Sequence, residues 1–256
     1  MPPLLNRAGD NLCNWLINSL LPGSCSLCLS PLQHSADALC HLCTAELPRL
    51  TTQCQRCAVP LASDALCANC QLKPPIFRRC ISAFHYQAPV DNIILRLKSD
   101  PYTTEIKQLS NVLAERIATT YQQAQLPCPQ TIIPLPLHWA KMTKRGFNQS
   151  HIIGNLIARQ LRREHGISID IRNDLCSRTI KGQEQHLLSA KKRLTSIKHA
   201  FSAEAQNLSG LSVAVVDDVV TTGATANSVA RALLQAGAAQ VDIWSIARTS
   251  WNNPAG

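Results

Sequence analysis

The spacing of apolar and polar residues changes near residue 81 and predicts two kinds of structure. Between residues 25 and 80 apolar residues are sparse and cysteines recur in pairs. Beyond residue 81 apolar residues follow either the two-residue period of strands or the 3.6-residue period of helices. Strands are predicted at 84–86, 131–135, 167–175, 213–216 and 241–246, and helices at 90–98, 105–123, 149–163 and 226–236.

This alternation predicts a mostly parallel sheet with helices on both faces, because parallel neighbours need crossovers and helices supply them. A chain of 256 residues can hold one such domain and a smaller one. The predicted parts are an N-terminal helix at 1–24, a cysteine-rich domain at 25–80 and the α/β domain at 81–256. Because no 18-residue apolar run and no signal-peptide core occur, we expect a cytoplasmic protein without membrane insertion.

Eight of the twelve cysteines form four Cys-x-x-Cys pairs within the cysteine-rich domain. In a reducing compartment such pairs are metal ligands or redox sites rather than structural disulfides. Four pairs in one stretch favour two structural zinc ions, each held by four thiolates. The predicted ligands are Cys25, Cys28, Cys40, Cys43, Cys54, Cys57, Cys67 and Cys70.

The cysteine-rich domain is an internal duplication. The segment CSLCLSPL from Cys25 matches CQRCAVPL from Cys54, and DALCHLC from Asp37 matches DALCANC from Asp64. If each repeat once folded alone, each zinc is held by the four cysteines of one repeat, whereas cross-bracing would pair alternate knuckles. Residues 1–80 hold six basic and four acidic residues, so bracing or protein docking is favoured over nucleic-acid binding.

The segment LSVAVVDDVVTTGAT, residues 211–225, carries the sharpest chemistry in the chain. A buried strand is followed by the carboxylates Asp217 and Asp218, and then by a Thr-Thr-Gly-Ala-Thr loop that opens a helix. Ligands of parallel sheets lie at the carboxyl ends of strands, and a helix N-terminus offers amides to an anion. This arrangement fits a ribose phosphate. No Gly-Lys-Ser/Thr is present to make a P-loop, and a receiver domain would place its acids at the first strand.

Positive charge is concentrated in residues 141–198, which hold thirteen Lys/Arg and four Asp/Glu. This excess equals the net charge of the whole chain, +9, and fits either pyrophosphate or a polynucleotide backbone. A basic-glycine turn lies between a strand end and a helix start, and its candidate pyrophosphate ligands are Lys144, Arg145, Gly146, Asn148 and Gln149. A polar segment follows that is long enough to form a lid, with candidate substrate ligands Arg178, Gln185 and Arg193.

These motifs resemble known families. Residues 217–225 resemble the signature that binds phosphoribosyl pyrophosphate (PRPP) in type I phosphoribosyltransferases. With the cysteine repeats, Arg145-Gly146-Phe147-Asn148-Gln149 and Gln185-x-x-Leu188-Ser189, the chain is identified as a member of the ComF family, of the GntX-type branch. The likeness covers nearly the whole chain. It departs at Gly182, where the family usually has Thr, and at Ser196, where it usually has Asn.

The resemblance implies a type I phosphoribosyltransferase-like sheet preceded by a small double zinc-ribbon domain. It implies that Asp217 and Asp218 hold the ribose 2′- and 3′-hydroxyls and that Mg²⁺ accompanies PRPP. The further implied PRPP-binding residues are Val219, Val220, Thr221, Thr222, Gly223, Ala224 and Thr225, of which Thr221 to Thr225 form the loop around the 5′-phosphate. It also implies a cytoplasmic role in natural competence and DNA uptake, with imported single-stranded DNA and cytoplasmic DNA-processing proteins as partners.

Three functions stay open on the sequence. The first is a phosphoribosyltransferase, hence a glycosyltransferase, that uses PRPP and an unknown acceptor. The second is a non-catalytic module for single-stranded DNA that PRPP regulates. The third is a housekeeping phosphoribosyltransferase of nucleotide metabolism. Its amidophosphoribosyl form is disfavoured because the chain has no glutaminase-sized domain.

Overall fold

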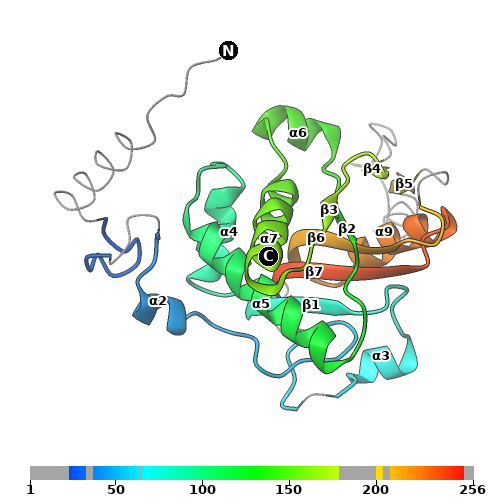
Figure 1. The fold of residues 1–256 in the computed structure, drawn as a ribbon, viewed down its shortest axis with the longest axis horizontal. Helices are drawn as coiled ribbons and strands as arrows, with labels where there is room; N and C mark the ends of the chain where they lie inside the picture. Colours follow the sequence, from blue (N-terminus) through cyan, green and yellow to red (C-terminus); the bar gives the residue numbers. More distant parts are fainter. Residues whose placement is uncertain (1–22, 33–36, 64, 179–199, 204–207, 251–256) are drawn as a thin grey trace, which may run out of the picture. The chain divides into compact units, whose positions relative to one another are not determined.

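The computed structural model describes residues 23–32, 37–63, 65–178, 200–203 and 208–250 (Figure 1). The chain divides into two compact units, Met1–Leu47 and Pro48–Gly256. The first cysteine repeat lies in the first unit, and the second repeat lies in the second unit with the sheet. The sequence pattern instead groups both repeats at 25–80, and those domain limits stay a prediction. The helix predicted at 1–24 lies outside the described residues, apart from its last two positions.

The two cysteine repeats have the same local backbone. In each, the amide of the first cysteine donates to the carbonyl five residues later at 2.8 Å, from Cys25 to Ser30 and from Cys54 to Val59. A short helix then begins directly after the third cysteine. These helices are α2 (His41–Ala45) and α3 (Ala68–Leu72). The duplication seen in the sequence is therefore also present in the structure.

The centre of the second unit is a five-stranded sheet in which every pair of neighbouring strands is parallel. The order across the sheet is β1 (Cys80–His85), β7 (Gln240–Arg248), β6 (Ser212–Val220), β2 (Thr131–Pro134) and β3 (Asp170–Ile171). The central strands β6 and β7 are rich in buried apolar residues, as expected for strands covered on both faces. All carboxyl ends therefore meet at one edge of the sheet.

Helices cover both faces of the sheet, which confirms the predicted α/β class (Figure 1). One face is covered by α4 (Val90–Leu97), α5 (Glu105–Gln123) and α7 (Gln149–His165). The other face packs on α9 (Ala224–Gln235), on the second cysteine repeat and on a hairpin of β4 (Cys176–Arg178) and β5 (Phe201–Ala203). No helix within the described ranges is long and apolar enough to cross a bilayer.

Three predicted segments differ from the structure. The strand predicted to end before the paired acids continues to Val220, because its pairing with β7 extends through Asp217 and Val220. The segment after β2, predicted to be a loop, contains helix α6 (Trp139–Arg145). The strand predicted at 167–175 is divided, because only Asp170–Ile171 pairs with β2 and Cys176–Arg178 joins the hairpin instead.

Candidate functional site

Strand β6, the loop after it and helix α9 form one continuous turn at the carboxyl edge of the sheet. Asp217 and Asp218 lie within the strand, followed by Val219 and Val220, its last residues. The loop of residues 221–225 joins α9 at Gly223, whose φ of 78° lies in the left-handed region that glycine adopts readily. This glycine is the N-cap and has no side chain, and the Ala224 amide donates to the Thr222 hydroxyl at 3.3 Å, so the other first-turn amides of α9 are those that can donate to a bound anion.

Asp217 is the partly buried member of the acidic pair. Its Oδ1 accepts hydrogen bonds from the Asp218 amide at 2.9 Å and from the Ser150 hydroxyl of α7 at 3.4 Å. Burial raises the pKa of Asp217 well above its ordinary value, and the nearby charge of Asp218 adds to the effect. The carboxyl group therefore ionises less readily than an exposed aspartate.

Asp218 is more buried and has a basic neighbour. Its Oδ1 accepts from the Val219 amide at 2.9 Å, and its Oδ2 lies 3.3 Å from Nζ of Lys98, which directly follows α4. Lys98 also acts to lower the pKa of Asp217, although burial and Asp218 outweigh it. One lysine thus offsets part of the negative charge of the pair.

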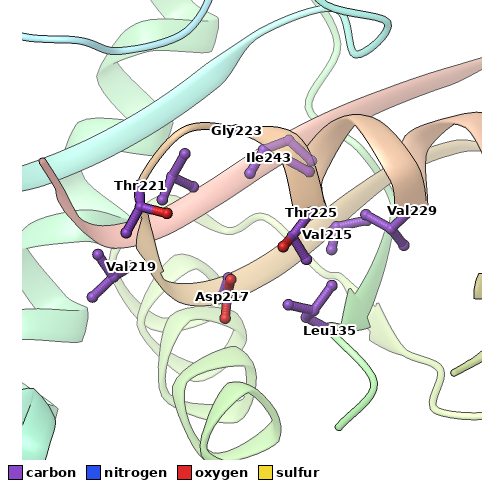
Figure 2. A pocket seen from close by; sticks show the side chains of 11 residues that line it. Leu135, Val215, Asp217, Val219, Thr221, Gly223, Thr225, Val229 and Ile243 are labelled. Atoms are coloured by element: carbon purple, nitrogen blue, oxygen red, sulfur yellow. The ribbon is translucent and has the colours of Figure 1, made fainter. Parts of the chain in front are cut away.

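The end of β6, the loop after it and the start of α9 line a small cavity of about 40 Å³. Figure 2 shows β6, the loop and α9 curving around it, with the hydroxyl groups of Thr221 and Thr225 turned toward the space between them. Asp217 lines the same cavity, whereas its remaining walls are mainly apolar, including Leu135 and Ile243. A charged ligand would therefore bind across the polar mouth rather than fill the cavity.

The basic-glycine turn connects α6 to α7. Gly146 ends α6 with φ 76°, and Asn148 caps α7 by accepting from the Ser150 amide at 3.0 Å. The Asn148 side-chain amide also donates to the Leu135 carbonyl at 3.1 Å. Because Leu135 follows β2 directly and lines the Asp217 cavity, this bond fixes the turn beside the site.

The two basic side chains of this turn have different surroundings. Arg145 donates through Nη1 to Oε1 of the buried Gln149 at 3.0 Å, whereas Lys144 is exposed. A cavity of about 420 Å³ lies against the turn, lined among others by Pro136, Met142 and Phe147. Lys144 is thus available to a ligand, while Arg145 would first have to release Gln149.

Arg178 is the one predicted lid residue that the structure describes. It ends β4, and its guanidinium carbon lies 5.4 Å from the centre of the Phe201 ring. Burial lowers the pKa of Arg178, while the charge of Asp217 acts in the opposite direction. Arg178 is therefore within electrostatic reach of the acidic pair. The other two predicted lid ligands, Gln185 and Arg193, lie outside the described residues.

The eight predicted cysteine ligands form two groups, whose ligand atoms all lie within 4.8 Å of one another. We call Cys25, Cys28, Cys40 and Cys43 the first cluster, and Cys54, Cys57, Cys67 and Cys70 the second cluster. In each, the Sγ atoms of the second and third cysteines are 3.7 Å apart. Sulfurs around a tetrahedral zinc, each about 2.3 Å from the metal, are about 3.8 Å apart. Both clusters therefore fit structural zinc, and the sequential pairing is confirmed.

Backbone amides favour the thiolate form that a metal needs. The Cys67 amide donates to Sγ of Cys54 at 3.4 Å, and the Cys43 amide donates to Sγ of Cys40 at 3.4 Å. Burial alone would raise the pKa of Cys54, but hydrogen bonds from the backbone of Cys67, Cys57 and Arg56 outweigh burial and lower it to about 7. The thiolate of Cys54 is thus favoured near neutral pH, whereas burial raises the pKa of Cys57 to about 11, so a metal that binds this cluster has to displace the Cys57 proton.

Three residues at the site were not predicted from the sequence. Lys98 faces Asp218, Ser150 donates to Asp217, and Arg248 donates to carbonyls at the start of the loop. Each comes from an element far from residues 211–225 in sequence, so only the order of the strands brings it near. The one available signal was an arginine at the end of the predicted strand that covers residues 241–246.

Known proteins resemble this chain over most of its length. The double zinc ribbon domain family matches residues 16–71. The DNA utilization protein YhgH of Salmonella typhi is 33% identical over 230 residues, which is 90% of this chain and 98% of the relative. Competence protein F of Haemophilus influenzae is 30% identical over 227 residues, which is 88% of this chain and 96% of the relative.

Among solved structures, hypoxanthine phosphoribosyltransferase from Trypanosoma cruzi aligns with 14% identity and a TM-score of 0.35. The alignment covers 57% of this chain and 78% of that one.

Proposed function

This chain belongs to the ComF family of competence and DNA utilisation proteins, and we propose that it binds PRPP with Mg²⁺. The proposed reaction transfers the phosphoribosyl group of PRPP to an acceptor molecule that takes part in the use of imported DNA. One observation carries the proposal. The acidic pair Asp217 and Asp218 lies two residues before a threonine-rich loop at the N-terminus of α9. Carboxylates and a phosphate cradle at this spacing suit the two ends of a ribose 5-phosphate.

Each group of site residues would bind a different part of the PRPP molecule. The carboxylates of Asp217 and Asp218 would accept hydrogen bonds from the ribose hydroxyls. Hydroxyls and amides of the loop, residues 221–225, would donate to the 5′-phosphate. Lys144, which is exposed, would meet the pyrophosphate, and Arg178 would add positive charge near the acidic pair. These roles use groups at the carboxyl edge of one parallel sheet, where ligands of such sheets bind.

The reaction would exchange one bond at the anomeric carbon. The lone pair of the acceptor forms a bond to this carbon as its bond to the pyrophosphate oxygen breaks, and that electron pair leaves with pyrophosphate. The proton of the acceptor passes to solvent. When bound, Mg²⁺ would neutralise charge on the departing pyrophosphate. The protein's own part is to hold the ribose and to supply positive charge at the leaving group.

Single-stranded DNA in the cytoplasm is the proposed partner. The basic stretch 141–198 and the names of the relatives support this choice. If the stretch contacts a phosphate backbone, DNA affinity should fall steeply as salt rises. A non-catalytic DNA module would show the same dependence with PRPP as a regulator, whereas a housekeeping enzyme would bind PRPP and ignore DNA.

Calorimetric titration of the full chain separates these functions. PRPP with Mg²⁺ is titrated alone and then with a short single-stranded DNA present, and pyrophosphate release is followed in parallel. Ribose 5-phosphate should bind at least about ten-fold more tightly than 2-deoxyribose 5-phosphate, because a hydrogen bond to a carboxylate contributes about 1.5–3 kcal/mol. Absence of PRPP binding would contradict the proposal, and DNA binding without pyrophosphate release would favour the regulated module.

The pKa of Asp217 predicts a pH dependence of binding. Ribose hydroxyls donate to the ionised carboxylate, so PRPP affinity should rise as pH rises through the raised pKa of Asp217, and binding should release a proton. Folding has the opposite sign: the folded chain binds this proton more tightly than the unfolded chain, so the Asp217 contribution to stability is lost as pH rises through that pKa. Calorimetry in two buffers of different ionisation enthalpy measures the proton count. In Asp217→Asn this count should be smaller, and an equal count would contradict the assignment.

A further inference from the structure

Arg248, the last residue of β7, connects the second cluster to the start of the phosphate loop. It is only 2% exposed. Its Nε donates to the carbonyl of Cys57 at 2.9 Å. Its Nη1 donates to the carbonyl of Val220 at 3.1 Å and to that of Thr221. One rigid guanidinium group therefore holds a metal-ligand residue and the beginning of the loop in fixed relation.

A second connection joins the same two regions. The amide of Ile76, which follows the second cluster, donates to Oδ1 of Asn227 in the first turn of α9 at 2.8 Å. A small cavity of about 40 Å³ between them is lined by Cys57, Cys70 and Thr222, among others. Thr221 and Thr225 of the loop thus line the same cavity as Asp217, whereas Thr222 lines the cavity beside the second cluster.

Both connections depend on the position of the second cluster. The backbone of a cysteine knuckle is ordered by its metal, since the binding free energy of a structural zinc is largely folding free energy. The Cys57 carbonyl is therefore fixed when four thiolates hold a metal. The first cluster belongs to the other compact unit, so the contacts that reach the loop come from the second repeat.

We propose that metal in the second cluster, acting through Arg248 as a positioning residue, fixes the loop of residues 221–225 in its anion-binding conformation. Metal occupancy of this cluster then controls affinity for the 5′-phosphate, and by reciprocity a bound phosphate raises metal affinity by the same factor. The identity of the ligand rests on the proposed function, whereas the coupling of metal to loop order does not. A zinc ribbon here serves the ligand site rather than DNA.

The experiment compares matched cysteines of the two repeats in the full chain. Cys70→Ser removes a ligand of the second cluster, and Cys43→Ser removes its counterpart in the first. Zinc content, amide hydrogen exchange at residues 221–225 and affinity for ribose 5-phosphate are measured for each. Cys70→Ser should speed exchange of the loop amides and weaken ribose 5-phosphate binding by about ten-fold or more. Cys43→Ser should leave both within about two-fold of wild type, since its cluster belongs to the other compact unit, whereas Arg248 binds the carbonyl of Cys57 in the second cluster.

Arg248→Lys keeps the positive charge and the second cluster but cannot donate in a fork. It should retain two zinc ions per chain and still show faster loop exchange and weaker ribose 5-phosphate binding, which keeps the test valid if Cys70→Ser fails to fold. Unchanged loop exchange in zinc-depleted protein and in Arg248→Lys would overturn the coupling. If wild type binds neither ribose 5-phosphate nor PRPP, the proposed function fails, while the exchange data still decide the coupling.

Discussion

Replacing both Asp217 and Asp218 with asparagine should abolish detectable PRPP binding while the protein stays folded. Asparagine keeps the shape of each side chain but accepts only neutral hydrogen bonds from the ribose hydroxyls. Losing the charge from two charge-assisted hydrogen bonds costs about 3 kcal/mol or more, which weakens PRPP affinity by at least about 100-fold. Titration calorimetry with PRPP and Mg²⁺ measures the change directly.

The same substitution should not lower the melting temperature. Asp217 is partly buried beside a second carboxylate, and its raised pKa means that ionisation there is unfavourable. Asparagine at both positions removes this repulsion. Lys98 loses its partner, but its side chain is 29% exposed and stays hydrated. Thermal denaturation should therefore give a melting temperature equal to or above that of wild type.

A matched control removes two negative charges elsewhere. Glu115 on α5 and Glu164 on α7 are exposed, with side chains 62% and 47% accessible. Glu115→Gln with Glu164→Gln changes the net charge as much as the double aspartate variant and should leave PRPP affinity within about two-fold. Equal PRPP affinity in the aspartate variant and wild type would contradict the role of the acidic pair.

Local patterns are enough to predict the proposed donor site, because its candidate residues lie in one short segment. The acids, the loop and the start of α9 are adjacent in sequence, and the glycine with φ 78° stands where the backbone needs it. The cysteine pairing was also predictable, since the two repeats carry the same spacing and each forms a closed group. In both cases the ligands are set by residues close together along the chain.

The site residues that the sequence did not predict are those that the order of the strands brings together. Lys98, Ser150 and Arg248 reach the segment from three other elements, and no local period identifies which strand lies beside which. Pairing between strands also explains why β6 is longer than the sequence predicted. Two adjacent aspartates are poor strand formers, but pairing with Ser245 and Arg248 of β7 extends the strand through them. Tertiary pairing therefore overrides the local preference.

Packing against the sheet and α9 explains why the second cysteine repeat belongs to the same compact unit as the sheet. Its buried residues, among them Ala58 and Val59, share one apolar cluster with α9 and with β6. A duplicated ribbon can thus keep one local fold while one copy is joined to a neighbouring core. The sequence shows only the duplication, because the difference between the copies lies in what packs against them.

Replacing Asp242 with alanine should produce the largest loss of stability in the sheet unit. Its fully buried carboxylate in β7 accepts hydrogen bonds from Nε of Arg78 at 2.9 Å, from Nη2 of Arg78 and from the hydroxyl of Tyr121. The hydrogen bond from Arg78 to Asp242 raises the pKa of Arg78. Removing one partner of a buried pair costs about 3–5 kcal/mol, or about 6–20 °C in melting temperature for a unit of this size.

The cost arises from the groups left behind rather than from a strong net attraction. Without Asp242, the Arg78 guanidinium keeps only partial contact with water, since its side chain is 21% exposed, and the Tyr121 hydroxyl loses its acceptor. Arg78→Met combined with Asp242→Leu removes both charges, so it should lose less stability than Asp242→Ala alone. Denaturant unfolding of the three proteins measures the two differences, and a double variant less stable than Asp242→Ala would refute this account.

A measurement of PRPP affinity distinguishes the hydrogen-bond network of Asp242 from the candidate site, which lies at the other edge of the sheet. Asp242 pairs with Ala214 near the start of β6, whereas Asp217 lies toward its carboxyl end. Below its melting temperature, folded Asp242→Ala should therefore bind PRPP within about three-fold of wild type, the reverse of the aspartate pair variant. If both results hold, stability and ligand recognition in this sheet depend on different carboxylates: Asp242, paired with arginine near the start of β7, and the acidic pair near the carboxyl end of β6.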